Sequence, residues 1–176
     1  NNIKNNKSSN QSKAVFSRQK LLTVVSHLES IFESLKPGYP AVTTWSNYYE
    51  ETILGKEYLF HKEALVKKFC SSLSYCTIVD LGANDGHFAR LLAEKDKQVI
   101  AVDIDSRCIN TLYQYTKQHS LTNIIALIAD LSNPSPAVGF NNAERSSLQA
   151  RLKPDLVLVL ALVHHLVIGK NIPLIL

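Results

Sequence analysis

Three aspartates stand at or near the ends of three short apolar runs in this chain. Asp80 lies near the end of the first run, Asp103 directly follows the second, and Asp130 follows the third. The intervals, 103 − 80 = 23 and 130 − 103 = 27 residues, each leave room for one helix between two strands. A carboxylate accepts hydrogen bonds from hydroxyl and amino groups. One such aspartate alone is most simply a cap for the next turn, but three in this order favour a binding site for a ligand rich in hydrogen-bond donors.

A glycine-containing turn follows the first apolar run, with the sequence Asp80-Leu-Gly82-Ala83-Asn84-Asp-Gly86. Gly82 and Gly86 permit backbone angles that other residues avoid, and they let a ligand approach the main chain closely. The helix expected directly after this turn presents free backbone N–H groups, which suit a carboxylate or another anion. The turn and the three aspartates together therefore predict one ligand site.

The elements that must position these residues are strands that alternate with helices. Four runs have the continuous apolar character of strands buried on both faces, at residues 77–81, 98–102, 123–129 and 155–160. Helices are expected between them, at residues 88–95, 107–118 and 143–152. This alternation predicts an α/β fold with a doubly wound, mainly parallel sheet. In such a sheet, ligands bind at the carboxyl ends of the strands, near the point where the strand order reverses.

The first part of the chain differs in composition from the rest. Residues 1–13 are mostly Asn, Ser and Lys and predict a disordered tail. Residues 14–74 predict a helical cap, in which apolar residues recur at helical spacing over 17–35 and 56–71. Residues 75–176 predict the ligand-binding core.

Trp45, Tyr48 and Tyr49 lie between the two helices expected in the cap. Aromatic side chains at this place could close the ligand pocket, and their faces attract cations. Ordinary packing of an appended helix explains them at least as well, so the sequence leaves both alternatives open.

Together these motifs resemble those of the class I methyltransferases that use S-adenosylmethionine (SAM). Asp80-Leu-Gly82-x-x-x-Gly86 is similar to the first motif of that family, Val102-Asp103-Ile104-Asp105 to the second, and Ala129-Asp130-Leu131 to the third. The run 154–160 resembles the fourth strand. The resemblance covers residues 77 to 166 and implies a Rossmann-like fold with SAM as the cofactor.

The resemblance also implies a role for each matching residue. The turn after the first strand would bind the methionine part of SAM, through Asp80, Gly82, Ala83, Asn84 and Gly86. Asp103 would accept hydrogen bonds from both ribose hydroxyls, and Asp130 would accept from the adenine amino group. Ile104 and Leu131 would enclose the adenine ring between them.

One position departs from the family pattern. Where many members have a glycine, this chain has Asn84. Asn tolerates left-handed backbone angles, so the turn is expected to survive, while the pose of the methionine end stays open. The Gly-x-Gly-x-x-Gly fingerprint of NAD-binding proteins is absent from this turn, which disfavours a dehydrogenase.

The run from Trp45 to Leu174 resembles, more loosely, a branch of bacterial methyltransferases related to nodulation proteins. The segments that carry this resemblance are residues 133–136, 144–145 and 162–166. The last of them contains His164 and His165, directly after the fourth strand, where the family often places residues that face the transferred methyl group. Either histidine could act as a general base, because its pKa lies near neutrality. The alternative is that one histidine packs and the other caps the following helix.

Composition limits the other classes of function. Hydrophobic residues make up 45% of the chain, as in globular proteins. The three cysteines lack metal-site spacing, so we expect reduced thiols, no metal and a cytoplasmic protein. No signal peptide is apparent, and the apolar run 156–176 is interrupted by polar residues, which predicts no membrane span. Asn171-Ile-Pro173 is typical of a helix start, so we expect a C-terminally truncated core that is itself inactive.

Three functions stay open at this point. A small-molecule methyltransferase ranks first, because the sequence contains no strong basic stretch and its net charge is only +4. An RNA or protein methyltransferase is the second candidate, and it predicts salt-sensitive substrate binding. The third is a non-catalytic module with the SAM-binding fold. The acceptor atom and the oligomeric state do not follow from the sequence.

Overall fold

The computed structural model describes residues 17–36, 38, 42–46 and 55–173 of the chain. The chain divides into two compact units, Asn1–Gly38 and Tyr39–Leu176. The predicted tail, residues 1–13, lies outside the described residues. The division of the rest into a helical cap (14–74) and a core (75–176) stays a prediction.

The described part of the first unit contains one helix, α1, at Arg18–Ser34. It begins where predicted, because Ser17 caps it: the Ser17 side chain accepts from the backbone N–H of Lys20 at 3.3 Å. None of its residues is buried. Its apolar side chains, among them Leu21, Val25 and Phe32, are 52%, 60% and 69% exposed.

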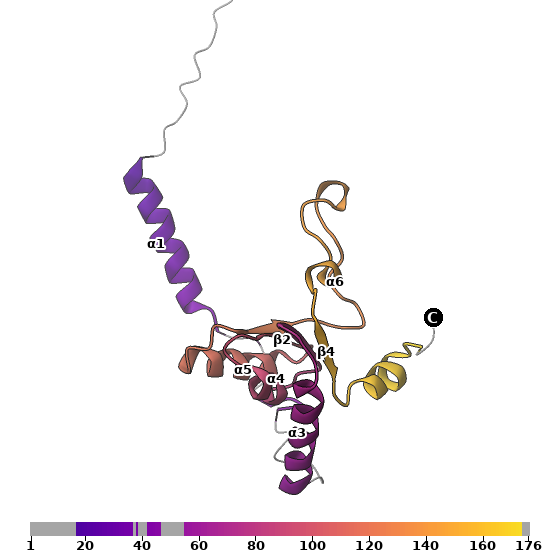
Figure 1. The fold of residues 1–176 in the computed structure, drawn as a ribbon. Coiled ribbons are helices and arrows are strands. Elements are labelled where there is room, and N and C mark those ends of the chain that lie inside the picture. Colours follow the sequence, from indigo (N-terminus) through magenta and orange to yellow (C-terminus); the bar gives the residue numbers. More distant parts are fainter. Residues whose placement is uncertain (1–16, 37, 39–41, 47–54, 174–176) are drawn as a thin grey trace, which may run out of the picture. The chain divides into compact units, whose positions relative to one another are not determined.

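The second unit is built on a four-stranded, entirely parallel sheet (Figure 1). Its strands are β1 at Thr77–Leu81, β2 at Gln98–Asp103, β3 at Ile124–Ile128 and β4 at Leu156–Val159. The order across the sheet is β3-β2-β1-β4. Successive strands run outward from β1 to β3, and the chain then returns to place β4 on the other side of β1. The predicted Rossmann-like fold is therefore confirmed, with its topological switch point between β1 and β4.

One face of this sheet carries the core. Ile78, Val99 and Ile124 lie side by side in the strand register and are 0%, 0% and 6% exposed. They belong to one buried cluster with residues of α3 (Lys56–Ser71), α4 (His87–Leu92) and α5 (Ser106–Gln118). The opposite face is less covered, since Ile125 and Val157 are 44% and 47% exposed.

The helices begin where local chemistry permits. The carboxylate of Asp105 accepts from the backbone N–H groups of Arg107 and Cys108 at 2.9 and 3.2 Å, which caps α5. Glu63 on α3 lies 2.8 Å from the imidazole of His87, the first residue of α4, and joins the two helices. Figure 1 shows α4 and α5 together on one side of the strands, apart from the loop that carries α6.

The helix expected at residues 143–152 is wrong for its first half. Residues 140–142 form a 3-10 turn, and Val138 pairs with Arg145 as an isolated β-bridge. The helix α6 spans only Leu148–Arg151, because the Ser147 hydroxyl accepts from Ala150 at 3.2 Å and caps it there.

The helix expected to start at Asn171-Ile-Pro173 would continue into residues 174–176, which lie outside the described residues, so it stays a prediction. A π-helical turn lies earlier, at His165–Gly169, and the helix ends at Lys170. Asn171 follows it with a left-handed backbone angle, φ 53°, and the Ile172 N–H donates to the carbonyl of Leu166 at 3.1 Å. Asn171 is thus a C-terminal cap. Among the described helices, none is long and apolar enough to cross a membrane.

Candidate ligand-binding site

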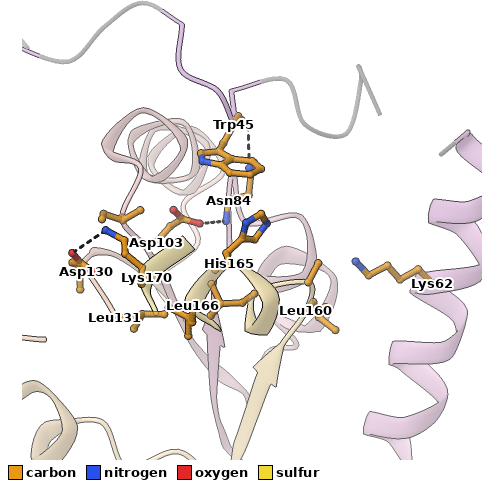
Figure 2. A pocket seen from close by; sticks show the side chains of 15 residues that line it. Trp45, Lys62, Asn84, Asp103, Asp130, Leu131, Leu160, His165, Leu166 and Lys170 are labelled. Atoms are coloured by element: carbon orange, nitrogen blue, oxygen red, sulfur yellow. Dashed lines mark hydrogen bonds and ion pairs between the residues drawn. The ribbon is translucent and has the colours of Figure 1, made fainter. Parts of the chain in front are cut away.

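A cavity of about 160 Å³ lies at the carboxyl ends of the strands in the second unit, as the switch-point rule predicts. Figure 2 shows side chains from β2 and from the segments after β1, β3 and β4 converging on it. The predicted residues that line it are Gly82, Asn84, Asp103, Ile104, Asp130, Leu131 and His165.

The turn after β1 is fixed by backbone hydrogen bonds. The N–H groups of Gly82 and Ala83 both donate to the carbonyl of Val102, at 2.9 and 3.0 Å. Gly82 has φ 77°, and a Cβ there would lie 3.2 Å from the side chain of Leu162 after β4. Both the backbone angle and this close approach favour glycine.

Gly86 fixes the same turn from the side of the helices. Its φ is 78°, and a Cβ would stand only 2.5 Å from Cδ1 of the buried Leu112 on α5. Ala83, which is 3% exposed, packs in the same core and does not line the cavity. Gly86 and Ala83 therefore hold the turn from its core side, away from the cavity.

Asp103 ends β2 with its carboxylate at the cavity. Its Oδ2 accepts from the backbone N–H of Asn84 at 2.8 Å, and its Oδ1 accepts from the backbone N–H of Asp105 at 2.9 Å. Each carboxylate oxygen can accept two hydrogen bonds. One site on each oxygen therefore remains, which suits a pair of neighbouring hydroxyl groups on a ligand.

Asp130 follows β3 and is held differently. Its Oδ1 accepts from both the N–H and the hydroxyl of Ser132, at 2.8 and 2.6 Å, and its Oδ2 lies 4.0 Å from the ammonium of Lys170. The Ser132 hydrogen bonds, joined by the charge of Lys170, lower the pKa of Asp130. The carboxylate is thus ionised; it caps a turn and also lines the cavity, and its binding role stays a prediction.

Asp80 lies behind the cavity wall. In the register of β1 it shares a face with Ile78 and points into the helix-covered core, where it is 3% exposed. Burial, with the nearby charge of Asp103, raises the pKa of Asp80 to about 7, and Lys62 acts in the opposite direction. Lys62, on α3, lines the cavity, and burial lowers the pKa of its ammonium group.

The segment after β4 brings His165 to the cavity, while the adjacent His164 does not line it. The two imidazoles lie 3.9 Å apart. Burial and the neighbouring charge of His164 lower the pKa of His165, so its imidazole is neutral at pH 7. The indole of Trp45 meets His165 edge to face at 5.0 Å and also lines the cavity. Tyr48 and Tyr49 lie outside the described residues.

Sequence reasoning missed several lining residues. Two are cationic: Lys62 projects from α3, and Lys170 follows the π-helical turn. Others are the apolar residues of the segment after β4, Leu160, Leu162 and Leu166. Because that segment follows a strand of a parallel sheet, the sequence could have indicated that its residues line the ligand site. Lys62 gave none, because nothing in a helical repeat shows which lysine faces a distant strand end.

Fold and site together define a Rossmann-like protein whose switch point presents a glycine turn, a strand-end carboxylate on β2 and a second carboxylate after β3. The described residues contain no group of three His, Cys, Asp or Glu side chains that could hold a metal ion.

Comparison with known proteins gives relatives for this arrangement. No family model matches the chain. It is similar to the nodulation protein NoeA of Rhizobium meliloti, with 30% identity over 152 residues, which are 86% of this chain and 32% of NoeA. It is also similar to an rRNA adenine N-6-methyltransferase of Bacillus licheniformis, with 32% identity over 72 residues, 39% of this chain and 25% of that protein. The predicted similarity to methyltransferases and to a nodulation-related protein is confirmed.

The chain spans about a third of the length of NoeA and a quarter of the length of the rRNA methyltransferase. Among solved structures, it is similar to EvdMO1, with a TM-score of 0.48 and 18% identity over 88% of this chain and 31% of that one.

Proposed function

We propose that this chain forms the SAM-binding part of a methyltransferase. The observation that carries the proposal is the pairing of Asp103 and Asp130 with the Gly82 turn around one cavity at the switch point of the sheet. Its sequence similarity to proteins named methyltransferases supports the same conclusion.

The residues around the cavity fit the parts of SAM. Asp103 retains one acceptor site on each oxygen for the two ribose hydroxyls, because its other sites are filled by backbone N–H groups. Ile104 and Leu131 offer apolar surface for the adenine ring, and Asp130 an acceptor for its amino group. The Gly82 turn leaves its main chain accessible to the methionine end, with Ala83, Gly86 and Asp80 supporting the turn from behind. When bound, SAM supplies an electrophilic methyl group on a positively charged sulfur.

The segment after β4 would serve the acceptor. His165 is a neutral imidazole at the cavity, so it can accept a proton from a hydroxyl or amine without first losing one of its own. His164, whose ring lies next to it at a 42° tilt and outside the cavity, would act only through His165. We place the reaction in the cytoplasm, since Cys70, Cys76 and Cys108 are free thiols, as in a reducing compartment.

A small molecule is the proposed acceptor, and RNA is the second candidate. The RNA alternative is favoured by the similarity to rRNA adenine N-6-methyltransferases, which covers 39% of the chain. The two predict different salt responses, because RNA binding weakens steeply as salt rises and binding of an uncharged metabolite does not.

Calorimetric titration with S-adenosylhomocysteine, the demethylated product, tests the proposal. Asp103→Ala removes a charged acceptor from the ribose and should weaken binding by about 1–3 kcal/mol. Asp96→Ala is the matched control, because it removes the same charge from an aspartate that is 78% exposed and does not line the cavity.

Wild-type binding that survives in Asp96→Ala and weakens in Asp103→Ala supports the proposal. Equal affinity in both variants contradicts the ribose assignment. No binding by the folded chain, repeated with a longer form of the protein, favours the non-catalytic module instead.

A further inference from the structure

The segment Val42–Ser46, here called the Trp45 turn, is closed by its own side chains. The N–H of Thr43 donates to the hydroxyl oxygen of Ser46 at 2.7 Å. The two hydroxyl groups also lie 2.8 Å apart. These contacts within the turn fix the direction of the Trp45 side chain.

Two further hydrogen bonds attach the Trp45 turn to the strand ends. The Thr43 hydroxyl donates to Oδ2 of Asp105 at 2.5 Å, and Asp105 is itself buried as the cap of α5. The side-chain amide of Asn84 donates to the carbonyl of Trp45 at 3.0 Å. The first bond links the turn to β2 and α5, and the second links it to the turn after β1.

The indole of Trp45 then reaches the other side of the cavity. Its ring meets the imidazole of His165, which comes from the segment after β4, edge to face at 5.0 Å with an interplanar angle of 77°. Figure 2 shows Trp45 beside Asn84 and His165, with Asp103 on the other side of Asn84. A continuous line of contacts therefore runs from Asp103 through Asn84 and Trp45 to His165.

Asn84 is suited to this place for two reasons. Its backbone has φ 53°, a left-handed angle that Gly or Asn adopts at low cost. A glycine would therefore satisfy the turn equally well, and would keep the backbone N–H that donates to Asp103 at 2.8 Å. Only the amide side chain supplies the additional N–H donor for the Trp45 carbonyl.

We propose that Asn84 is a positioning residue that holds the Trp45 indole against His165 at the mouth of the cavity. The proposal deepens the proposed function, because it assigns to one residue the link between the cofactor side and the acceptor side of the site. The contact itself does not depend on which ligand the cavity binds.

The chain contains a single tryptophan, so its intrinsic fluorescence reports on Trp45 alone. A protonated imidazole next to an indole quenches indole fluorescence, while a neutral one does so much less. The ionisable groups next to His165 or lining the same cavity are His164 and Lys170 on its own segment, and Lys62, Asp103 and Asp130 from α3, β2 and the loop after β3. Burial and the charge of His164 lower the pKa of His165 below its usual value of 6.5.

The test is a fluorescence titration from about pH 8 to about pH 5 without ligand, a range that covers histidine protonation. The wild-type chain should lose fluorescence in one step with a midpoint below 6.5. His165→Gln should abolish that step. Asn84→Gly removes the amide but fits the backbone angle, and Asn84→Asp keeps the shape but lacks the N–H donor. Both should shrink the step, because the ratio of contacting to released Trp45 falls roughly fivefold when one hydrogen bond is lost.

Full wild-type steps in both Asn84 variants would overturn the proposal, as would a step that persists in His165→Gln. Because no cofactor is present, the expected pattern can hold even if S-adenosylhomocysteine does not bind, and failure of the two proposals is therefore distinguishable.

Discussion

The turn after β1 and the segment after β4 face the same cavity but are built in opposite ways. The turn is held by backbone hydrogen bonds to Val102 and by close packing of Gly86 on Leu112. The segment after β4 contains a π-helical turn, and Ala161 within it has a left-handed angle of φ 58°. His165, which it brings to the cavity, is exposed.

This difference separates two tasks. A cofactor that is the same in every turnover is best met by fixed main-chain geometry. An acceptor that differs between related enzymes is better met by side chains on a less constrained segment, where changes cost little stability. π-Helical turns are rare and occur often at functional sites, which agrees with this division.

Valine substitution at one glycine of each region should show the largest difference. A Cβ at Gly86 would meet Leu112 at 2.5 Å in a left-handed backbone, whereas a Cβ at Gly169 in the π-helical turn meets nothing within 4 Å. Gly86→Val should lower the free energy of unfolding by about 2–5 kcal/mol, through backbone strain and overpacking. Gly169→Val should change it by less than about 1 kcal/mol. Urea unfolding measures both, and equal effects would contradict the comparison.

The buried Asp80, beside the turn after β1, makes folding stability depend on pH. Its pKa is about 7 in the folded protein and near 3.8 in the unfolded chain, so between these values the folded state binds more protons. Stability from this group is therefore fully present below about pH 4 and is lost as the pH rises through 7. The cost is about 1.4 kcal/mol for each unit of the pKa difference.

Asp80→Asn should remove that loss, so the unfolding free energy of the variant should decline less than that of the wild-type protein between pH 4 and pH 7. Asp96→Asn, at a position 78% exposed, is the control and should follow the wild type. A variant that declines in parallel with the wild-type protein would show that Asp80 is ionised throughout.

The smallest effect is expected at the ion pair between Asp130 and Lys170, which connects the end of β3 to the segment after β4. The two charges lie 4.0 Å apart and their side chains are 36% and 49% exposed, so solvent screens them. Lys170→Ala should change the unfolding free energy by less than about 1 kcal/mol. A loss of several times that amount in urea unfolding would mean that this pair holds the segment in place.

Sequence alone could predict the region of the turn much better than the segment after β4. The positions of the strands, the glycine turn, Asp103 and Asp130 follow from local sequence rules. The sequence therefore predicted where each of them lies. The sequence predicted that Asp80 contributes a carboxylate to the site. The direction of its side chain depends on the two-residue alternation of β1, which places it with Ile78 in the core.

The other region depends on tertiary contacts that no local pattern contains. The π-helical turn has no sequence signature, and the Asn171-Pro173 motif fits a helix start as well as the cap that it forms. The helix expected from residue 143 does not form there, because two adjacent serines favour a cap at Ser147 over a continuing helix. Lys62 reaches the cavity only through the packing of α3.

The most direct test of the account is an amide shift map of the chain in complex with S-adenosylhomocysteine, recorded by NMR. The N–H groups of Asn84 and Asp105 both donate to Asp103, so a ribose that binds this carboxylate must change both hydrogen bonds. We predict that these two amides and that of Gly82 shift most. Binding accompanied by shifts elsewhere and none at Asn84 and Asp105 would contradict a cofactor site at this switch point.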